Sequence, residues 1–328
     1  MERGDGVRTL VTGAFGCIGS WVVRALLADG ERPVLYDRAD DPWRLRLIAG
    51  ADVVARVTIV RGDIADRAAL TRAATQHEAT RLIHLAAWQI PLCRQDPAQG
   101  ALVNVVGTAN VFEAARAAGI RRVVYASSAA VFGPPSLYPP GPIHDDAPPR
   151  PATHYGVYKV ANEETARIYW DEHGIASAGV RPLTVYGPGR DVGLTADPTL
   201  AMKAAVLGRP FQIRWGGATD LIYAADVARA LLAASRATLD RARVYNLHGA
   251  SAAVADVVRL IERAWPSAKG LVDHVEAPIP FPDALDDARY QADLGPAPRT
   301  SLEDGVRVTL GEFARLQAAG TLDARELG

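Results

Sequence analysis

Short apolar segments alternate with amphipathic stretches through the first half of this chain. Candidate strands are residues 7–13, 32–37, 57–63, 81–87 and 122–128. Between them lie Ala-, Leu- and Arg-rich stretches such as 20–30 and 105–119, each closed by a glycine of the kind that ends helices. Strands that alternate with helices imply βαβ units, and near-continuous Val, Ile and Leu suits a sheet covered on both faces. The pattern predicts an α/β fold with a doubly wound parallel sheet.

The second half is less regular. Residues 133–151 carry eight prolines and are expected to be a loop that leads into the next helix. Beyond residue 182 the segments shorten, and TSLED at 300–304 offers Ser301 as the N-cap of a last helix. We expect a dinucleotide-binding domain over residues 1–181 and a smaller α/β substrate-binding domain over 182–328, with about 219–250 returning to the first domain.

Composition narrows the classes of partner. Hydrophobic residues make up 49% of the 328, charged residues 22%, and the net charge is −1, so the chain has no basic footprint for nucleic acid. It has no apolar run long enough to span a membrane, and its N-terminal segment has no signal-peptide core. Two cysteines and seven scattered histidines give no metal-ligand spacing. We expect a cytoplasmic protein with a small-molecule partner and no metal.

Glycines follow the first strand at a spacing that suits phosphate binding. Gly13, Gly16 and Gly19 allow a tight turn before a helix, whose N-terminus favours a pyrophosphate. Asp37 ends the second strand, where a carboxylate accepts from a ribose 2′-hydroxyl and repels a 2′-phosphate, so NAD is favoured over NADP. Arg38 next to it keeps NADP as the lesser alternative. Asp63, after the third strand, either accepts from an adenine amino group or only caps a turn.

The stretch THYGVYK at 153–159 holds two tyrosines near one lysine. Residues four apart face each other on a helix, so Lys159 pairs with Tyr155 and Tyr158 points elsewhere. A positive charge close to a phenol lowers its pKa, which would make Tyr155 a base near neutral pH. Only three of the 36 cations are lysines, Lys159, Lys203 and Lys269, so position 159 requires a lysine rather than a generic charge.

These segments together resemble the extended short-chain dehydrogenase/reductase superfamily, in its NAD-dependent epimerase/dehydratase branch. The matching segments cover nearly the whole chain: VTGAFGCIGS (11–20), HLAA (84–87), 104–115, YASSAAVFG (125–133), YGVYK (155–159), VYGPG (185–189) and TSLEDGV (300–306). The resemblance implies a Rossmann-like sheet and a catalytic set of Ser128, Tyr155 and Lys159. Tyr155 would take a proton from a substrate hydroxyl as hydride leaves for the nicotinamide, Ser128 would hold that hydroxyl, and Lys159 would also bind the cofactor ribose.

The resemblance also implies the remaining site residues, with Asn104 matching an asparagine that is structural in the family. The cofactor-binding set is Gly13, Phe15, Gly16, Cys17, Ile18, Gly19, Asp37, Asp63, Ile64, Leu85, Ala86, Ala87, Asn104, Ala126, Tyr155, Lys159 and Pro182. The substrate set is Gln89, Ser127, Ser128, Thr184 and Arg190. Helices around 98–118 and 155–173 match those through which family members pair, so a homodimer is expected.

The chain departs from the family pattern at four positions. Ala129 and Ala130 replace the Asp-Glu pair of family dehydratases, so dehydration is not expected. Thr184 and Thr219 stand where nucleotide-sugar members carry an Asn and an Arg that meet the diphosphate. Thr219 does not neutralise charge, although Arg190 or Arg214 could compensate.

These departures favour a net NAD-dependent dehydrogenase that acts on a sugar, sugar acid or polyol. The alternatives are a sugar or nucleotide-sugar epimerase with tightly held NAD, and a catalytically inactive NAD-binding regulatory protein.

Overall fold

The computed structural model describes residues 7–327; residues 1–6, part of the N-terminal segment considered above, lie outside the described residues. The chain divides into two compact units. The first holds the described residues up to Ser128, Thr153–Arg181 and Ala228–Tyr245, and the second holds Ala129–Ala152, Pro182–Val227 and the residues from Asn246 on. Within residues 7–327, no helix is both long and apolar enough to cross a membrane.

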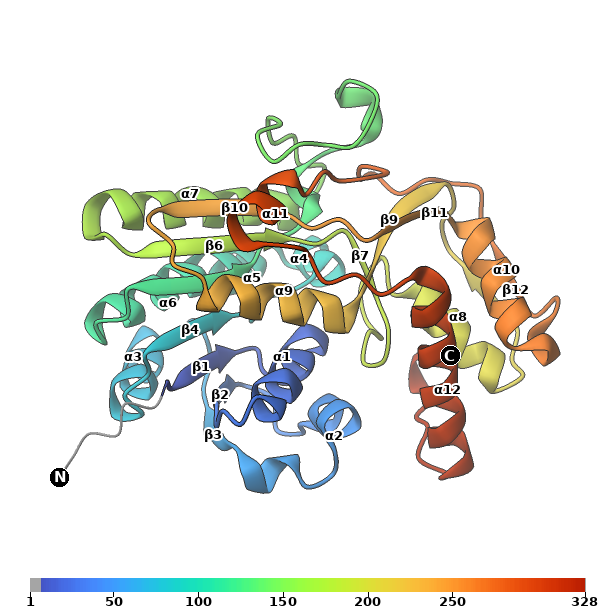
Figure 1. Ribbon diagram of the computed structural model, residues 1–328, viewed down its shortest axis with the longest axis horizontal. Helices are drawn as coiled ribbons and strands as arrows, with labels where there is room; N and C mark the ends of the chain where they lie inside the picture. The colour runs from blue at the N-terminus through green and yellow to red at the C-terminus, as the bar shows by residue number, and fades with distance from the viewer. Residues whose placement is uncertain (1–6, 328) are drawn as a thin grey trace. The chain divides into compact units, whose positions relative to one another are not determined.

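The first unit is built on a seven-stranded parallel sheet, which confirms the predicted fold class (Figure 1). Its order is β10-β6-β5-β4-β1-β2-β3. The strands are β1 (Thr9–Thr12), β2 (Val34–Asp37), β3 (Thr58–Arg61), β4 (Arg81–His84), β5 (Arg122–Ala126), β6 (Ala176–Arg181) and β10 (Ala242–Asn246). The five expected strands all form, each two or three residues shorter than predicted.

Helices cover both faces of this sheet. They are α1 (Cys17–Ala28), α2 (Trp43–Ala49), α3 (Arg67–Gln76), α4 (Ile90–Gln95), α5 (Pro97–Ala101), α6 (Gly107–Ala117), α7 (His154–His173) and α9 (Ala224–Arg236). A π-helical turn, Leu102–Val106, joins α5 to α6, and a 3-10 turn spans Val53–Arg56. α3, α6 and α7 pack on one face, whereas Arg236 of α9 bonds Asp29 and Glu31 just beyond α1.

Strand order positions the functional site. β1 pairs with β2 on one side and with β4 on the other, with Leu10 opposite both Val34 and Leu82. The chain therefore leaves β1 in one direction and returns across it to build β4 and β5. In open parallel sheets, ligands bind in the crevice beyond the carboxyl ends of the strands at such a reversal. The residues after Thr12 and after His84 border that crevice.

The second unit has a three-stranded sheet in the order β11-β9-β7 and a two-stranded sheet of β12 and β8. Its strands are β7 (Thr184–Tyr186), β8 (Phe211–Ile213), β9 (Ala218–Tyr223), β11 (Ala250–Ala253) and β12 (Val272–His274). Its helices are α8 (Asp197–Val206), α10 (Val254–Ala264), α11 (Ala288–Leu294) and α12 (Leu302–Ala318), with 3-10 turns at Ala129–Val131, Pro135–Leu137, Pro266–Ala268 and Arg325–Leu327. Ser301 caps α12 by accepting from Asp304 N at 3.1 Å, as predicted.

The proline-rich loop is anchored inside the second unit. Ile143 N donates to Ala284 O at 3.0 Å, and Asp286 N donates back to Ile143 O at 2.9 Å. Asn246 adds its side-chain amide to Ile143 O at 2.8 Å. Apart from the single turn at Pro135–Leu137, residues 133–151 form no helix, as their prolines predict.

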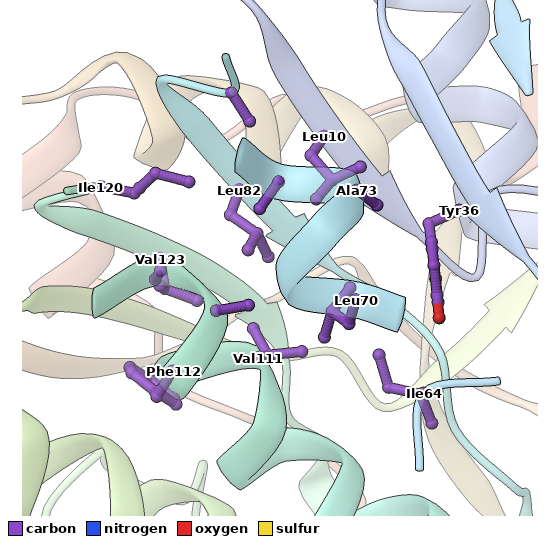
Figure 2. Packing of buried hydrophobic residues seen from close by; sticks show 14 of the residues in the cluster. Leu10, Tyr36, Ile64, Leu70, Ala73, Leu82, Val111, Phe112, Ile120 and Val123 are labelled. Carbon is purple, nitrogen blue, oxygen red and sulfur yellow. The ribbon is translucent and has the colours of Figure 1, made fainter. Parts of the chain in front are cut away.

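The core of the first unit lies between the sheet and the pair α3 and α6. Figure 2 shows Leu70 and Ala73 of α3 and Val111 and Phe112 of α6 directed toward the strand residues Leu10, Leu82 and Val123. Phe112 is fully buried, stacks on Tyr169 with ring centroids 4.9 Å apart, and meets the edge of Tyr125 at 6.3 Å. It thus joins α6 to both α7 and β5.

Replacing this ring tests the core. We expect Phe112→Ala to lower the free energy of unfolding by about 3–5 kcal/mol, because buried apolar surface is lost and a cavity remains. Val54→Ala, at a side chain that is 40% exposed, is the control and should change it by less than about 0.5 kcal/mol. Urea denaturation followed by circular dichroism measures both. Equal losses for the two variants would contradict this account of the core.

Candidate functional site

The glycine-rich loop lies in close contact with the residues that follow β4. Gly13 has φ +67°, and a Cβ built on it would stand 2.5 Å from Ala86 N. A Cβ on Gly19 would stand 2.2 Å from Gly13 O, so the first turn of α1 packs against the loop. Gly16 is the N-cap of α1 and donates its N–H to Gly13 O at 3.1 Å. Only glycine fits at positions 13 and 19, and the N-terminus of α1, where helix N–H groups favour an anion, lies at this loop.

Asp37 ends β2 and ties it to this loop. One carboxylate oxygen accepts from Phe15 N at 2.9 Å and the other from Ala39 N at 3.0 Å. A carboxylate has about four acceptor positions, so Asp37 keeps acceptor capacity for a hydroxyl of a ligand.

A cavity of about 550 Å³ brings most of the predicted cofactor residues together. Its predicted lining residues are Gly13, Phe15, Gly16, Asp37, Asp63, Ile64, Leu85, Ala86 and Ala87. Cys17 and Ile18 begin α1 beside the loop. The cavity is also lined by Tyr36, Arg38 and Trp88, which the sequence analysis did not include in the site. The position of Trp88 directly after HLAA was the available signal, since that segment leads out of β4 at the crevice.

Asp63 makes a turn contact and also lies at the cavity. Its Oδ1 accepts from Ala65 N at 2.9 Å, which is a turn contact, and the residue also lines the cavity. Its Oδ2 lies 3.9 Å from the Arg38 guanidinium, which sits 5.9 Å from the centroid of the Trp88 ring. Arg38 is therefore held over the cavity by a carboxylate and an aromatic face.

A buried histidine, His84, connects the elements next to the cavity through hydrogen bonds. His84 Nδ1 lies 2.7 Å from Thr12 Oγ1 and its Nε2 lies 3.1 Å from Thr108 Oγ1, which itself donates to Asn104 O at 2.7 Å. Burial lowers the pKa of His84 to about 3, so the ring is neutral. The chain of bonds connects β1, β4 and the helix that starts near Asn104.

Asn104 acts on the cavity through the backbone. Its Oδ1 accepts from Trp88 N at 2.8 Å and its Nδ2 donates to Trp88 O at 3.0 Å. The residue lies in the π-helical turn, a feature common at functional sites. Its amide is thus bonded to the segment after β4, in agreement with a structural role, and it holds that segment in place.

The catalytic candidates lie at the start of α7 and after β5. Thr153 caps α7 by accepting from Gly156 N at 3.0 Å, and this cap fixes the phase of the helix. Lys159 Nζ lies 5.4 Å from the centroid of the Tyr155 ring, whereas Tyr158 turns away and donates its hydroxyl to Pro97 O at 2.7 Å. The helical period therefore predicts correctly which tyrosine lies beside the lysine.

Lys159 is buried, and its Nζ donates to Ala126 O at 2.6 Å, two residues before Ser128. Burial lowers its pKa to about 8, while the charge of Glu163 opposes that shift. The bond to Ala126 O brings the lysine to the end of β5. Tyr155, Lys159 and Ser128 all belong to the first unit.

Two of the predicted substrate residues, Ser127 and Thr184, form hydrogen bonds with other side chains of the protein. Ser127 is buried and donates its hydroxyl to Glu163 Oε1 at 2.5 Å. Thr184 is fully buried, and its hydroxyl lies 2.8 Å from that of Thr219 on the neighbouring strand. Both hydroxyls therefore have a hydrogen-bond partner within their own unit, and the inclusion of Ser127 and Thr184 in the substrate set stays a prediction.

The other predicted residues have these positions. Gln89 is the N-cap of α4 and is partly buried directly after Trp88. Arg190 donates from Nη2 to Thr195 Oγ1 at 3.2 Å, and Pro182 O accepts from Ala129 N at 3.0 Å, both within the second unit. Arg214, considered as a compensating cation, forms an ion pair with the fully buried Asp197 at 2.6 Å.

Nowhere in the part of the chain that the structure describes do three or more His, Cys, Asp or Glu side chains gather as metal ligands would.

The sequence pattern of the NAD dependent epimerase/dehydratase family matches residues 9–247. The chain belongs to this family. Over 320 residues it is 34% identical to a UDP-glucose 4-epimerase of Mycolicibacterium smegmatis, a match that covers 94% of this chain and 99% of that protein.

Two solved structures are also similar, and in each match 94% of this chain and 99% of the other chain are covered. The UDP-glucose 4-epimerase of Thermus thermophilus in complex with NAD is 26% identical with a TM-score of 0.80. A partial consensus L-threonine 3-dehydrogenase is 25% identical with a TM-score of 0.83.

The residues of this epimerase/dehydratase-family protein fit NAD, the cofactor of the family. The loop has no room for a Cβ at Gly13 or Gly19, so its backbone lies directly beside the cavity that Gly13 and Gly16 line. Asp37 lines the cavity with acceptor capacity left over, which suits a ribose with a free 2′-hydroxyl. The same carboxylate would repel the 2′-phosphate of NADP.

Gly19→Ala tests whether the glycine-rich loop binds the pyrophosphate of NAD. The new Cβ would meet Gly13 O and Ala14 Cα, so the loop must move and its N–H groups shift from the pyrophosphate. We expect about 10- to 100-fold weaker NAD binding, the value of one charged hydrogen bond. Calorimetric titration with NAD measures this directly.

The control is Gly311→Ala, in open space on α12. It should leave NAD affinity unchanged and raise the free energy of unfolding by about 0.5–1 kcal/mol, because alanine is the better helix former. An NAD affinity of Gly19→Ala equal to that of the wild type would contradict pyrophosphate binding by this loop.

Proposed function

We propose that this protein is an NAD-dependent sugar 4-epimerase that acts on a UDP-hexose. The placement of the Lys159 ammonium beside the Tyr155 ring and at the end of β5 carries the proposal, because reversible oxidation of a hydroxyl needs a base activated in this way. The 34% identity to a 4-epimerase over nearly the full length of both chains supports it. This favours the epimerase alternative over the net dehydrogenase that the sequence alone suggested.

In the proposed reaction Tyr155 takes the proton of the sugar hydroxyl, while Ser128 donates a hydrogen bond that holds its oxygen. Lys159 supplies the positive charge that favours the phenolate form of Tyr155. When bound, NAD would supply the hydride-transfer chemistry for this oxidation and for the return reaction at the other face of the sugar. Tyr155 then gives the proton back, so the sugar is inverted with no net redox change.

Dehydration is not part of the proposal, because acids are lacking where dehydratases have them. Ala129 and Ala130 are buried in a short 3-10 turn directly after Ser128. A carboxylate pair at these positions would be needed to remove water from the keto sugar.

The test is incubation with UDP-glucose, UDP-galactose, UDP-glucuronate and the free sugars, each with NAD. We expect a UDP-sugar to give its C4 epimer by ¹H NMR, without accumulation of NADH at 340 nm. Tyr155→Phe should lower kcat by roughly 100- to 10,000-fold with KM little changed, because it removes only the proton transfer. Absence of turnover on the whole panel, with NAD still bound, would instead support an NAD-binding regulatory protein.

A dehydrogenase of a smaller substrate is the second candidate, favoured by the absence of a cation at position 219. Thr219 bonds to Thr184 and carries no charge. The charge of Arg214, in the same unit, is already matched by Asp197, so Arg214 does not replace the missing cation. The similar consensus L-threonine 3-dehydrogenase shows that this fold also hosts net oxidation. NADH formed in proportion to a substrate without a nucleotide, and no epimer, would support this candidate.

We also propose a homodimer. Leu102 and Val106 on the π-helical turn and Val157 and Ile168 on α7 are large apolar side chains that are each at least 39% exposed. They lie on the two helical segments through which the resemblance implies pairing. Light scattering should give a mass of about twice 34.9 kDa, and Val157→Asp/Ile168→Asp should shift it to that of one chain. A monomeric wild-type protein would contradict this.

A further inference from the structure

A buried ion pair lies one helical turn beyond the catalytic lysine. Glu163 is four residues after Lys159 and eight after Tyr155, so the three side chains share one face of α7. Glu163 Oε1 accepts from Arg181 Nε at 2.7 Å, and Oε2 accepts from Arg181 Nη2 at 2.6 Å. The side chains of the pair are only 8% and 5% exposed.

Stability alone gives a weak reason for burying these charges. Removing two charges from water costs much of what their attraction returns, and apolar replacements are often as stable. The neighbouring residue Glu164 forms its ion pair with Arg167 at 2.9 Å in solvent, on the other side of the same helix. The position of Glu163 therefore calls for a different explanation.

Glu163 and Lys159 each contact a residue that directly precedes Ser128 in the chain or lies two residues before it. Ser127 Oγ donates to Glu163 Oε1 at 2.5 Å, and Lys159 Nζ donates to Ala126 O at 2.6 Å. Two side chains of α7 thus hold Ala126, the last residue of β5, and Ser127, the residue directly before Ser128. Arg181, at the end of β6, fixes Glu163 from the opposite direction.

We propose that Glu163 is a positioning residue of the catalytic set: through Ser127 it fixes the segment that carries Ser128, and it places a carboxylate one helical turn from Lys159. The inference rests on the proposed roles of Ser128 and Lys159. Nothing in it depends on which sugar is bound.

The electrostatic surroundings of Lys159 support this role. The titratable and charged groups around it are Tyr155 and Glu163 on α7, Cys93 on α4, His84 on β4, Tyr125 on β5 and Arg181 on β6. His84 is neutral, and burial raises the pKa values of Cys93 and Tyr125, so neither carries charge at neutral pH. Glu163 is then the anion that opposes the desolvation of Lys159.

These opposing influences determine in which direction the pKa of Lys159 changes when Glu163 is replaced. Burial favours the neutral amine and Glu163 favours the ammonium, so removing the carboxylate lowers the pKa of Lys159 further below about 8. The ammonium is then lost at a lower pH. The alkaline decline of kcat should move in the same direction.

The chain allows a direct test, because it has only three lysines. Protein labelled with ¹³Cε-lysine gives few resonances to follow with pH, and Lys159→Met assigns the one of interest. We expect Glu163→Gln to lower the pKa of Lys159 by about one unit. Glu163→Gln/Arg181→Met should lower it by less, because the Arg181 cation is removed as well, and this variant leaves no buried unpaired guanidinium. Glu164→Gln, the matched control on the next residue, should leave it unchanged.

A Lys159 titration equal to wild type in both Glu163 variants would overturn the electrostatic part, and it is measured without any substrate. It is therefore distinct from failure of the epimerase assay. Ser127→Ala tests positioning: on the substrate that is turned over, kcat should fall about tenfold with KM and the Lys159 titration unchanged, the loss of about 1.4 kcal/mol in the transition state. An unchanged kcat in Ser127→Ala would overturn that part.

Discussion

The approach of the Gly13 backbone to the segment after β4 is the constraint on which the first unit depends. A Cβ at Gly13 would lie within 2.7 Å of three backbone atoms of Leu85 and Ala86. The contact occurs where the strand order reverses, so the two loops that diverge from β1 and β4 must pass each other there. His84 and Asn104 then fix the far side, the first through Thr12 and Thr108 and the second through Trp88. The shape of the cavity follows from these backbone contacts.

Local signals in the sequence predicted a large part of this. The spacing of glycines, the Thr153 and Ser301 caps, the period of α7 and the apolar strands all act between residues close in sequence. Each is confirmed because neighbours along the chain determine it. The sheet and its reversal follow from the alternation of strands and helices together with the handedness of parallel crossovers.

Pairings between distant residues were not predictable in the same way. Ser127 was expected to face substrate, but its partner Glu163 lies 36 residues away, and Thr184 meets Thr219 across 35 residues. Arg214 was considered as a free cation, whereas Asp197 of α8 binds it. A polar residue in a motif segment tells which chemistry is available. The direction of its side chain depends on what the fold brings opposite it, and a local motif does not show that.

The use of lysine at 159 and arginine at 181 has a geometric reason. In a chain whose cations are nearly all arginine, Arg181 meets both oxygens of one carboxylate, which its planar fork matches. Lys159 Nζ donates to one carbonyl at 2.6 Å and lies beside the Tyr155 ring, which suits a compact charge on a thin stem. A guanidinium there would leave donors unsatisfied and would stay charged at every pH. The ammonium, with its pKa of about 8, responds to its surroundings, so the carboxylate one turn away becomes part of how the site works.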